Sequence, residues 1–510
     1  MAHGVESFFR SGINQLRCTP RLIIPFLISN ALAYALIWTI ILSFVFFSLP
    51  VLGKIVPVIE KNQDLISQIV TKQSIGINTD LQVQELQKEF SDLFPDILPI
   101  LIAFLIGFFL IMLIGFLLFA WTRGGTIGYT WQGITGSLDF KNFRYHARNN
   151  IFRIAGLWIL IILISIILFL MPFSALVILP MPAGIIVFIL MLLLFLILWV
   201  IIMLLLFFSE ECIVVENKSI IEAVRQSKGL VLGDIASVLL FIVIFISIIL
   251  IFGVISFTFE FITGIFNSNI SSFFELFSLI VLGPWISLAK LNFFLDRTGR
   301  PVMAMEKEIA YIEATKGLII RSPVILVDFV KKNLLYVLTA FCFYLGGFGL
   351  GYYVGNSFSF LKDELMLLIG RSLENTLLGP YHSLPFLDLL NYFSNNGIVA
   401  LNQALSGIFF VIPSLFGVIV NGIIMGLFYG VMPVEAASAF IALHGVFEIT
   451  AFLITTAAGI RLGVKFMKGT ENENELLDET LMIVLASLLL IGIAAFLEAF
   501  ITPVIVWIMI

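Results

Sequence analysis

Long apolar runs separated by short polar stretches make up most of this chain. A membrane-spanning helix needs about 20 consecutive apolar residues, and many runs reach that length. The pattern predicts an all-α, polytopic integral membrane protein with about eleven transmembrane helices, six in the first part of the chain and five in the second. The expected spans lie near residues 22–48, 97–120, 152–172, 184–208, 235–257, 271–290, 333–355, 397–413, 415–431, 436–461 and 480–510.

Lysine and arginine gather in alternate loops between these runs. Because cytoplasmic loops collect basic side chains, this alternation predicts a multi-pass protein of the cell membrane with a cytoplasmic N-terminus. The acidic segment 49–96 and the segment 356–395 are then expected on the outer side.

The stretch 393–430 decides the direction of the helices that follow it. A single crossing would place Arg461, Lys465 and Lys468 outside, against the positive-inside bias. Two short passes, with a break at Pro413, remove the conflict, because proline lacks the amide hydrogen that a helix interior uses. A re-entrant hairpin over 397–431 is the alternative interpretation.

Two polar segments have the periodicity of helices that lie in the membrane surface. The first 21 residues carry arginines ahead of a long apolar run and predict an amphipathic helix leading into a retained anchor. Residues 220–232 alternate apolar and charged side chains in the same way. For this second segment, a solvated connector is an equal alternative.

Composition supports the membrane class and excludes others. Hydrophobic residues make up 60% of the 510 residues and charged residues 12%, with a formal net charge of -5. No basic stripe interleaved with aromatic residues is present, so a nucleic-acid partner is not expected. Cys18, Cys212 and Cys342 are scattered, which favours neither a disulfide framework nor a metal site. We expect no cofactor and no metal.

The longest polar stretch on the predicted inner face, 296–333, divides the chain. We place a domain boundary near residue 320. The predicted domains are a six-span membrane domain at 1–319, which carries the outer segment 49–96, and a five-span membrane domain at 320–510.

Three linked motifs in the second domain carry a family resemblance. They read NNGIVALNQALSGIFFVIPSLFGVIVNGIIMGLFYG at 395–430, LHGVFEITAFLITTAAGIRLG at 443–463, and LEAFITP at 497–503. In order and spacing they resemble the core of the stage II sporulation protein M family. That family usually has proline before the His-Gly pair and often after the glutamate, where this chain has Leu443 and Thr450.

This resemblance implies an integral membrane component, known in spore formers as part of a peptidoglycan-remodelling machine. It does not imply sporulation, because the family extends into archaea and non-sporulating bacteria. The first domain has a second likeness: EECIVVENKSIIEAVRQSKGLVLGDI at 210–235 resembles the membrane domain attached to glycerophosphodiester phosphodiesterases. The catalytic barrel of those enzymes is absent from this sequence.

Ionisable side chains inside the second domain are the candidate site. His444 and Glu448 are four residues apart and therefore share one helix face, and an ionised carboxylate at membrane depth is costly. Asn421 and Glu498 are the other polar partners that we expect nearby. A packing clamp among the four, a protonatable transport site, and half of a zinc site are the three interpretations; a catalytic zinc usually has three protein ligands.

Glycines at four-residue spacing predict close helix packing, because small residues let helix backbones approach in a membrane. They could meet within one chain or between two copies. The expected packing glycines are Gly347, Gly351, Gly355, Gly422, Gly426, Gly459 and Gly463.

From these patterns we expect a non-enzymatic membrane scaffold or envelope-remodelling component with no catalytic residues. Membrane lipids, protein partners at 49–96 and 356–395, and a second copy of the chain are the expected contacts. A transporter of a small solute or lipid that uses His444 and Glu448 is the alternative.

Overall fold

The computed structural model describes residues 4–62, 80–136, 138–300, 311–357, 383–409, 411–469 and 472–509. Within these ranges all regular structure is helical, so the predicted all-α class is confirmed. By length and composition, ten helices in the described ranges could cross a membrane. Helix α16 (Pro385–Leu405) is long enough, with 21 residues, but is less apolar and is not among those ten, although it overlaps a predicted span.

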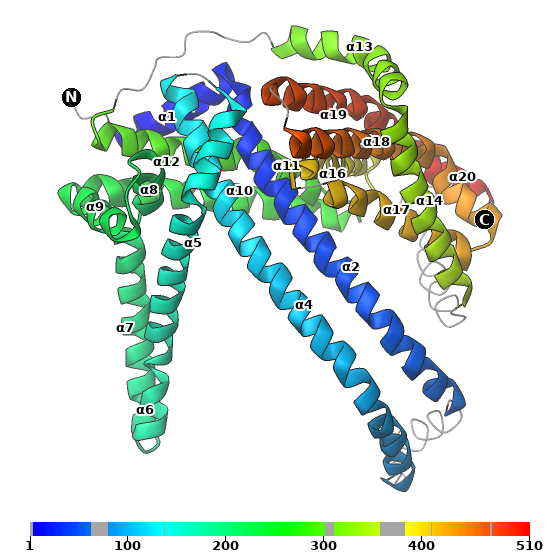
Figure 1. Cartoon of the computed structure of the whole chain (residues 1–510), viewed down its shortest axis with the longest axis horizontal. Helices are drawn as coiled ribbons and strands as arrows, with labels where there is room; N and C mark the ends of the chain where they lie inside the picture. The colour runs from blue at the N-terminus through cyan, green and yellow to red at the C-terminus, as the bar shows by residue number, and fades with distance from the viewer. Residues whose placement is uncertain are drawn as a thin grey trace. The chain divides into compact units, whose positions relative to one another are not determined.

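The chain forms two compact units, residues 34–116 and residues 1–33 with 117–510. In the first unit, α2 (Ile24–Lys61) and α4 (Asp80–Thr135) run side by side (Figure 1), with Phe44 and Phe47 against Phe104. Lys54 pairs with Asp96 at 2.7 Å. This ion pair is exposed, so it contributes at most about 1 kcal/mol.

The second unit begins with the predicted amphipathic helix, α1 (Val5–Cys18), followed by the 3-10 turn η1 (Pro20–Ile23). Its apolar face packs on α12 (Gly283–Arg297). The side-chain amides of Gln15 and Asn292 exchange two hydrogen bonds, at 3.1 and 3.0 Å. The face that the sequence places at the membrane surface is therefore covered by protein.

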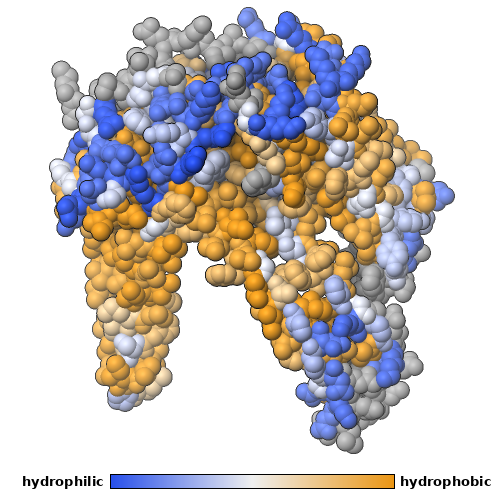
Figure 2. All heavy atoms as spheres, in the orientation of Figure 1, coloured by the Kyte–Doolittle hydropathy of each residue, from blue (hydrophilic) through white to orange (hydrophobic). Residues whose placement is uncertain are grey.

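A second helical hairpin follows α4. It consists of α5 (Phe140–Leu170), the short α6 (Phe173–Ile178) and α7 (Ala183–Leu205). Figure 2 shows apolar side chains covering this hairpin below a polar region. Its exposed leucine and isoleucine side chains suit contact with lipid.

The polar segment after α7 folds as two short helices, α8 (Ser209–Val215) and α9 (Ile220–Gly233). A capping box fixes the start of α9: the Ser219 hydroxyl accepts from the backbone N–H of Glu222, whose carboxylate accepts from the Ser219 backbone. These bonds from Ser219 lower the pKa of the Glu222 carboxyl. Then come α10 (Ile235–Ile265), α11 (Ser271–Phe277) and the π-helical turn η2 (Ser278–Leu282), which leads into α12.

The C-terminal helices form a bundle. Their bounds are α13 (Tyr311–Lys332), α14 (Leu334–Ser357), α16, η4 (Ser406–Phe409), α17 (Val411–Val431), α18 (Val434–Lys468), α19 (Glu473–Phe496), the π-helical turn η5 (Leu497–Ile501) and α20 (Thr502–Met509). Pro413 lies in the first turn of α17, where a missing N–H costs nothing. The break that the sequence places at Pro413 therefore falls just before it, at η4.

The two predicted domains share this second compact unit. Arg21 pairs with Asp478 at 2.5 Å, and the Asn30 amide donates to Asn402 at 3.0 Å. Trp121 stacks edge-on against Phe409. The boundary near residue 320 therefore stays a prediction. Parts of the predicted partner segments and of the inner linker, residues 63–79, 358–382 and 301–310, lie outside the described residues.

Candidate functional site

The glycines of α14 and α17 bring these two helix backbones into direct contact. A Cβ atom added at Gly347 or Gly351 would overlap the carbonyl oxygens of Ile419 or Ile423 on α17. On the opposite helix, a Cβ at Gly426 would overlap the carbonyl of Phe348. Only glycine permits so close an approach, and Gly355 packs on Gly430 at the end of the same row.

A second close contact joins α18 to the turn between α16 and α17. Cβ atoms at Gly459 and Gly463 would approach the carbonyl oxygens of Gln403 and Gly407 to 2.5 and 2.8 Å. The fully buried Gln403 carbonyl Oε1 accepts hydrogen bonds from the hydroxyls of Thr455 and Thr456, both at 3.3 Å. These buried amide and hydroxyl groups hold the irregular η4 turn against a regular helix.

The structure brings His444, Glu448 and Glu498 together. One ligand atom from each residue lies within 4.8 Å of the other two. His444 and Glu448 are one turn apart on α18, and Glu498 lies in the π-helical turn η5. His444 is buried, 8% exposed, and both glutamates are half-buried.

Thr502 completes the cluster, and the sequence analysis did not identify it. Its hydroxyl forms a 3.2 Å hydrogen bond with Nδ1 of His444. This bond orients the imidazole ring and does not involve the second ring nitrogen, Nε2. The available signal was its position four residues after Glu498 in LEAFITP. Tyr344 and Tyr392 lie near Glu448 and Glu498 respectively.

Asn421 lies on α17 and is half-buried. Among the described residues, it makes no hydrogen bond with His444, Glu448 or Glu498. The clamp role of these four residues stays a prediction.

The chemistry of the cluster follows from its two carboxyl groups. If both were ionised at this separation and away from water, they would repel each other strongly, so a shared proton or a bound cation would lower the free energy. One imidazole and two carboxylates are also a ligand set that a divalent transition metal accepts. Among the described residues, these three side chains form a group that could hold a shared proton or a metal ion.

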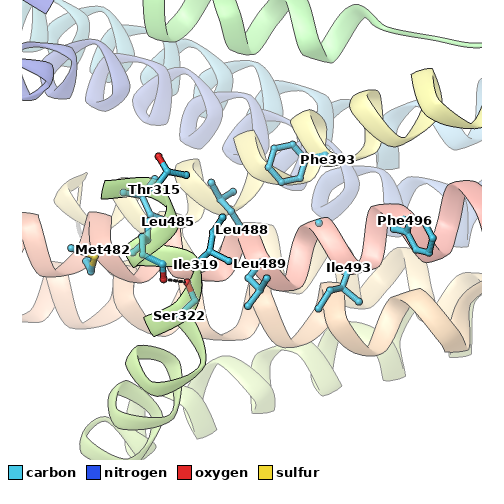
Figure 3. Close-up of a pocket in the computed structure, with 12 residues that line it drawn as sticks. Thr315, Ile319, Ser322, Phe393, Met482, Leu485, Leu488, Leu489, Ile493 and Phe496 are labelled. Atoms are coloured by element: carbon cyan, nitrogen blue, oxygen red, sulfur yellow. Dashed lines mark hydrogen bonds between the residues drawn. The ribbon is translucent and has the colours of Figure 1, made fainter. Parts of the chain in front are cut away.

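A large apolar cavity of about 720 Å³ lies between helices of the bundle. Figure 3 shows its walls, which come from α13, α16 and α19. Ile319, Phe393, Leu488 and Ile493 are among the lining residues.

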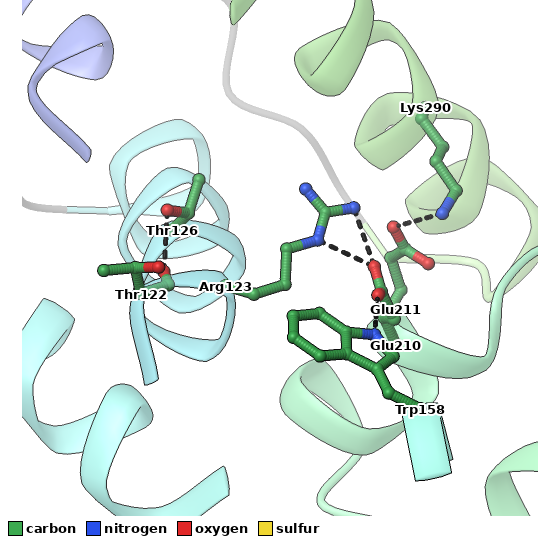
Figure 4. Close-up of polar contacts among 7 residues, drawn as sticks. All are labelled: Thr122, Arg123, Thr126, Trp158, Glu210, Glu211 and Lys290. Carbon is green, nitrogen blue, oxygen red and sulfur yellow. Dashed lines mark hydrogen bonds and ion pairs between the residues drawn. The ribbon is translucent and has the colours of Figure 1, made fainter. Parts of the chain in front are cut away.

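A half-buried charge network lies in the first part of the chain, and the sequence analysis missed it. Arg123 of α4 donates to Glu210 of α8 at 2.7 Å, and the Trp158 indole N–H donates to the same carboxylate at 2.9 Å (Figure 4). Lys290 pairs with Glu211, which is 3% exposed, at 2.9 Å. Removing Lys290 would be destabilising, because it leaves the buried Glu211 carboxylate without its ion-pair partner. The network ties α4, α5, α8 and α12 together.

These features define a polytopic helical membrane protein whose C-terminal bundle is packed through glycine and holds the polar cluster of His444, Glu448 and Glu498. Residues 339–503 match the model of the family described as Stage II sporulation protein M. The uncharacterized protein MJ0793 of Methanocaldococcus jannaschii is 32% identical over 138 aligned residues, which cover 23% of this chain and 78% of that protein. The chain belongs to the stage II sporulation protein M family. No solved structure matches it.

Proposed function

We propose that the chain is a non-enzymatic membrane scaffold or envelope-remodelling component. The contact between α14 and α17 carries this proposal. Each glycine of the row lies against a backbone carbonyl or another glycine of the opposite helix, so the two helices have no free space in which to shift. A bundle of this kind suits a protein that holds partners in place.

In this proposal the N-terminus is cytoplasmic, and the segments 49–96 and 356–395 meet protein partners outside the membrane. The basic loops support this orientation. A cysteine at Val434, the exposed first residue of α18, is then labelled by a membrane-impermeant thiol reagent added outside intact cells. Labelling of this cysteine from the cytoplasmic side alone would place the start of α18 inside and contradict the proposed orientation.

Transport of a small solute or lipid is the second candidate. The close approach of His444, Glu448 and Glu498 favours it, because intramembrane ionisable groups often serve proton or ion pathways. A transporter must open to alternate sides of the membrane, and this requires helices of the core to part.

A reversible cross-link between α14 and α17 separates the two candidates. A Cβ atom built at Gly355 or Gly430 lies 3.1 Å from the Cα of the other glycine, in the last turns of their helices. Cysteines at both positions therefore need only a small separation of the helix ends to form a disulfide. The three native cysteines are first replaced by alanine.

The variant is tested in cells that lack the gene, with the cross-linked fraction measured by thiol labelling. A scaffold keeps its function when cross-linked and after reduction. Loss of function that reduction restores would contradict the scaffold and favour transport. Each single cysteine variant controls for strain from the added side chain.

A further inference from the structure

Two apolar cavities share a wall that α16 and α19 form together. The first is the cavity of about 720 Å³ between α13, α16 and α19 (Figure 3). The second, of about 370 Å³, lies between the start of α2, α16 and α19. Phe393, Leu485 and Leu488 line both cavities. The two apolar spaces therefore diverge from one place.

The two cavities carry few hydrogen-bonding side chains; the hydroxyls of Thr315 and Ser322 line the first, and Arg21 lies at the second. In the first, the hydroxyl of Ser322 already donates to the carbonyl of Leu318 at 2.9 Å. The remaining lining is almost entirely aliphatic and aromatic. Such walls suit hydrocarbon chains.

A third cavity, of about 740 Å³, is polar and adjoins both apolar ones. It shares Met482 with the first and Arg21 with the second. Along α13 and along α19, the lining changes from charged to apolar within a few turns. One polar cavity therefore adjoins two apolar cavities, an arrangement that matches a lipid headgroup attached to two hydrocarbon chains.

The charges of the polar cavity are partly paired already. Arg21 pairs with Asp478, and Arg461 pairs with Glu479. Lys332 and Asp328 also line the cavity, are exposed, and form no ion pair with another described residue. Glu475 also lines the cavity; it accepts a hydrogen bond from the Asn472 amide at 3.1 Å and forms no ion pair with another described residue. One positive and two negative side chains thus remain without an ion pair.

We propose that these three cavities bind one two-chained phospholipid with a zwitterionic phosphoethanolamine headgroup. The two chains fill the apolar cavities, Lys332 pairs with the phosphate, and Asp328 accepts hydrogen bonds from the ammonium. The four acidic residues that line the polar cavity, Asp328, Glu475, Asp478 and Glu479, outnumber its three basic residues and disfavour a headgroup with net negative charge. The predicted cytoplasmic side of Lys465 and Lys468 places the lipid in the inner leaflet.

Native mass spectrometry of the purified full chain tests this site. The protein is titrated with phosphatidylethanolamine and with phosphatidylglycerol of the same chains, and the bound fraction is read from the mass of each complex. We expect phosphatidylethanolamine to bind about tenfold more tightly, which corresponds to about 1.4 kcal/mol. Equal affinity, a preference for phosphatidylglycerol, or no retained lipid would overturn the proposal.

Variants locate the bound lipid. Lys332→Ala and Asp328→Asn should each lower the affinity for phosphatidylethanolamine about tenfold. Lys465→Ala, which lies outside the cavity, should leave that affinity unchanged. Gly492→Leu fills the first cavity, since a Cβ there meets only the Phe393 ring at 3.8 Å. This variant should bind both lipids more weakly.

Gly253→Leu is the matched control, because a Cβ at Gly253 of α10 has nothing within 4 Å. Equal binding by Gly492→Leu and Gly253→Leu would place the lipid elsewhere. The lipid titration does not depend on movement of the core. Failure of the lipid proposal therefore leaves the scaffold proposal standing, and failure of the scaffold proposal leaves the lipid proposal standing.

Discussion

Helices α17 and α10 are both apolar enough to cross a membrane, yet they pack very differently. Of the most apolar 18 residues of each helix, 39% are buried in α17 and 11% in α10, although α10 is the more apolar. Lipid chains are as apolar as leucine, so hydrophobicity places a helix in the membrane without choosing its neighbours. Close backbone approach decides which helices pack.

Glycine alone does not produce that approach. Gly253 of α10 has nothing within 4 Å of the position of a Cβ, whereas Gly422 and Gly426 of α17 lie against carbonyls of α14. In α17 these glycines face a second row of glycines on α14, whereas no described residue approaches Gly253. A glycine therefore contributes to packing only where a partner backbone faces it.

Gly426→Leu should have the largest effect on stability of the variants that compare α17 with α10. Its side chain must displace the backbone at Phe348, so we expect a loss of about 3 kcal/mol of stability or failure to accumulate. Gly253→Leu should change the melting temperature in detergent little. If Gly426→Leu does not accumulate, Gly426→Ala gives a smaller loss in the same direction. Equal melting temperatures for the leucine variants would refute the glycine interface.

A smaller effect should follow from truncating leucine in the two regions. Leu462 of α18 is fully buried, and Leu250 of α10 is 60% exposed. Leu462→Ala should lower stability by about 2 kcal/mol or more, because it leaves a cavity. Leu250→Ala should lower it by less than about 0.5 kcal/mol, because lipid or detergent fills the space. Thermal unfolding of both variants in one detergent gives the difference, and similar losses would mean that α10 is packed.

The sequence predicted the membrane class because run length and basic loops are local signals. It also predicted a break between α16 and α17, but it placed that break at Pro413, which lies in the first turn of α17, instead of at η4. It did not identify the bond between His444 and Thr502, which joins residues 58 positions apart, or the pairing of Arg123 with Glu210 across 87 positions. Such contacts depend on which helices are neighbours, and no spacing along one helix carries that information.

The central claim is that the C-terminal bundle is a packed unit whose polar cluster stabilises the helices. Glu448→Gln tests it most directly, because glutamine and a protonated glutamate have nearly the same shape and both donate a hydrogen bond. Glu448→Ala removes the polar group and should cost about 1–3 kcal/mol.

The measurement is melting temperature in detergent beside complementation in cells, for Glu448→Gln, Glu448→Ala and His444→Ala. We predict that Glu448→Gln melts close to the unmodified protein and still complements, and that Glu448→Ala melts lower. A Glu448→Gln protein that is equally stable but fails to complement would contradict this account, because function would then require the proton itself.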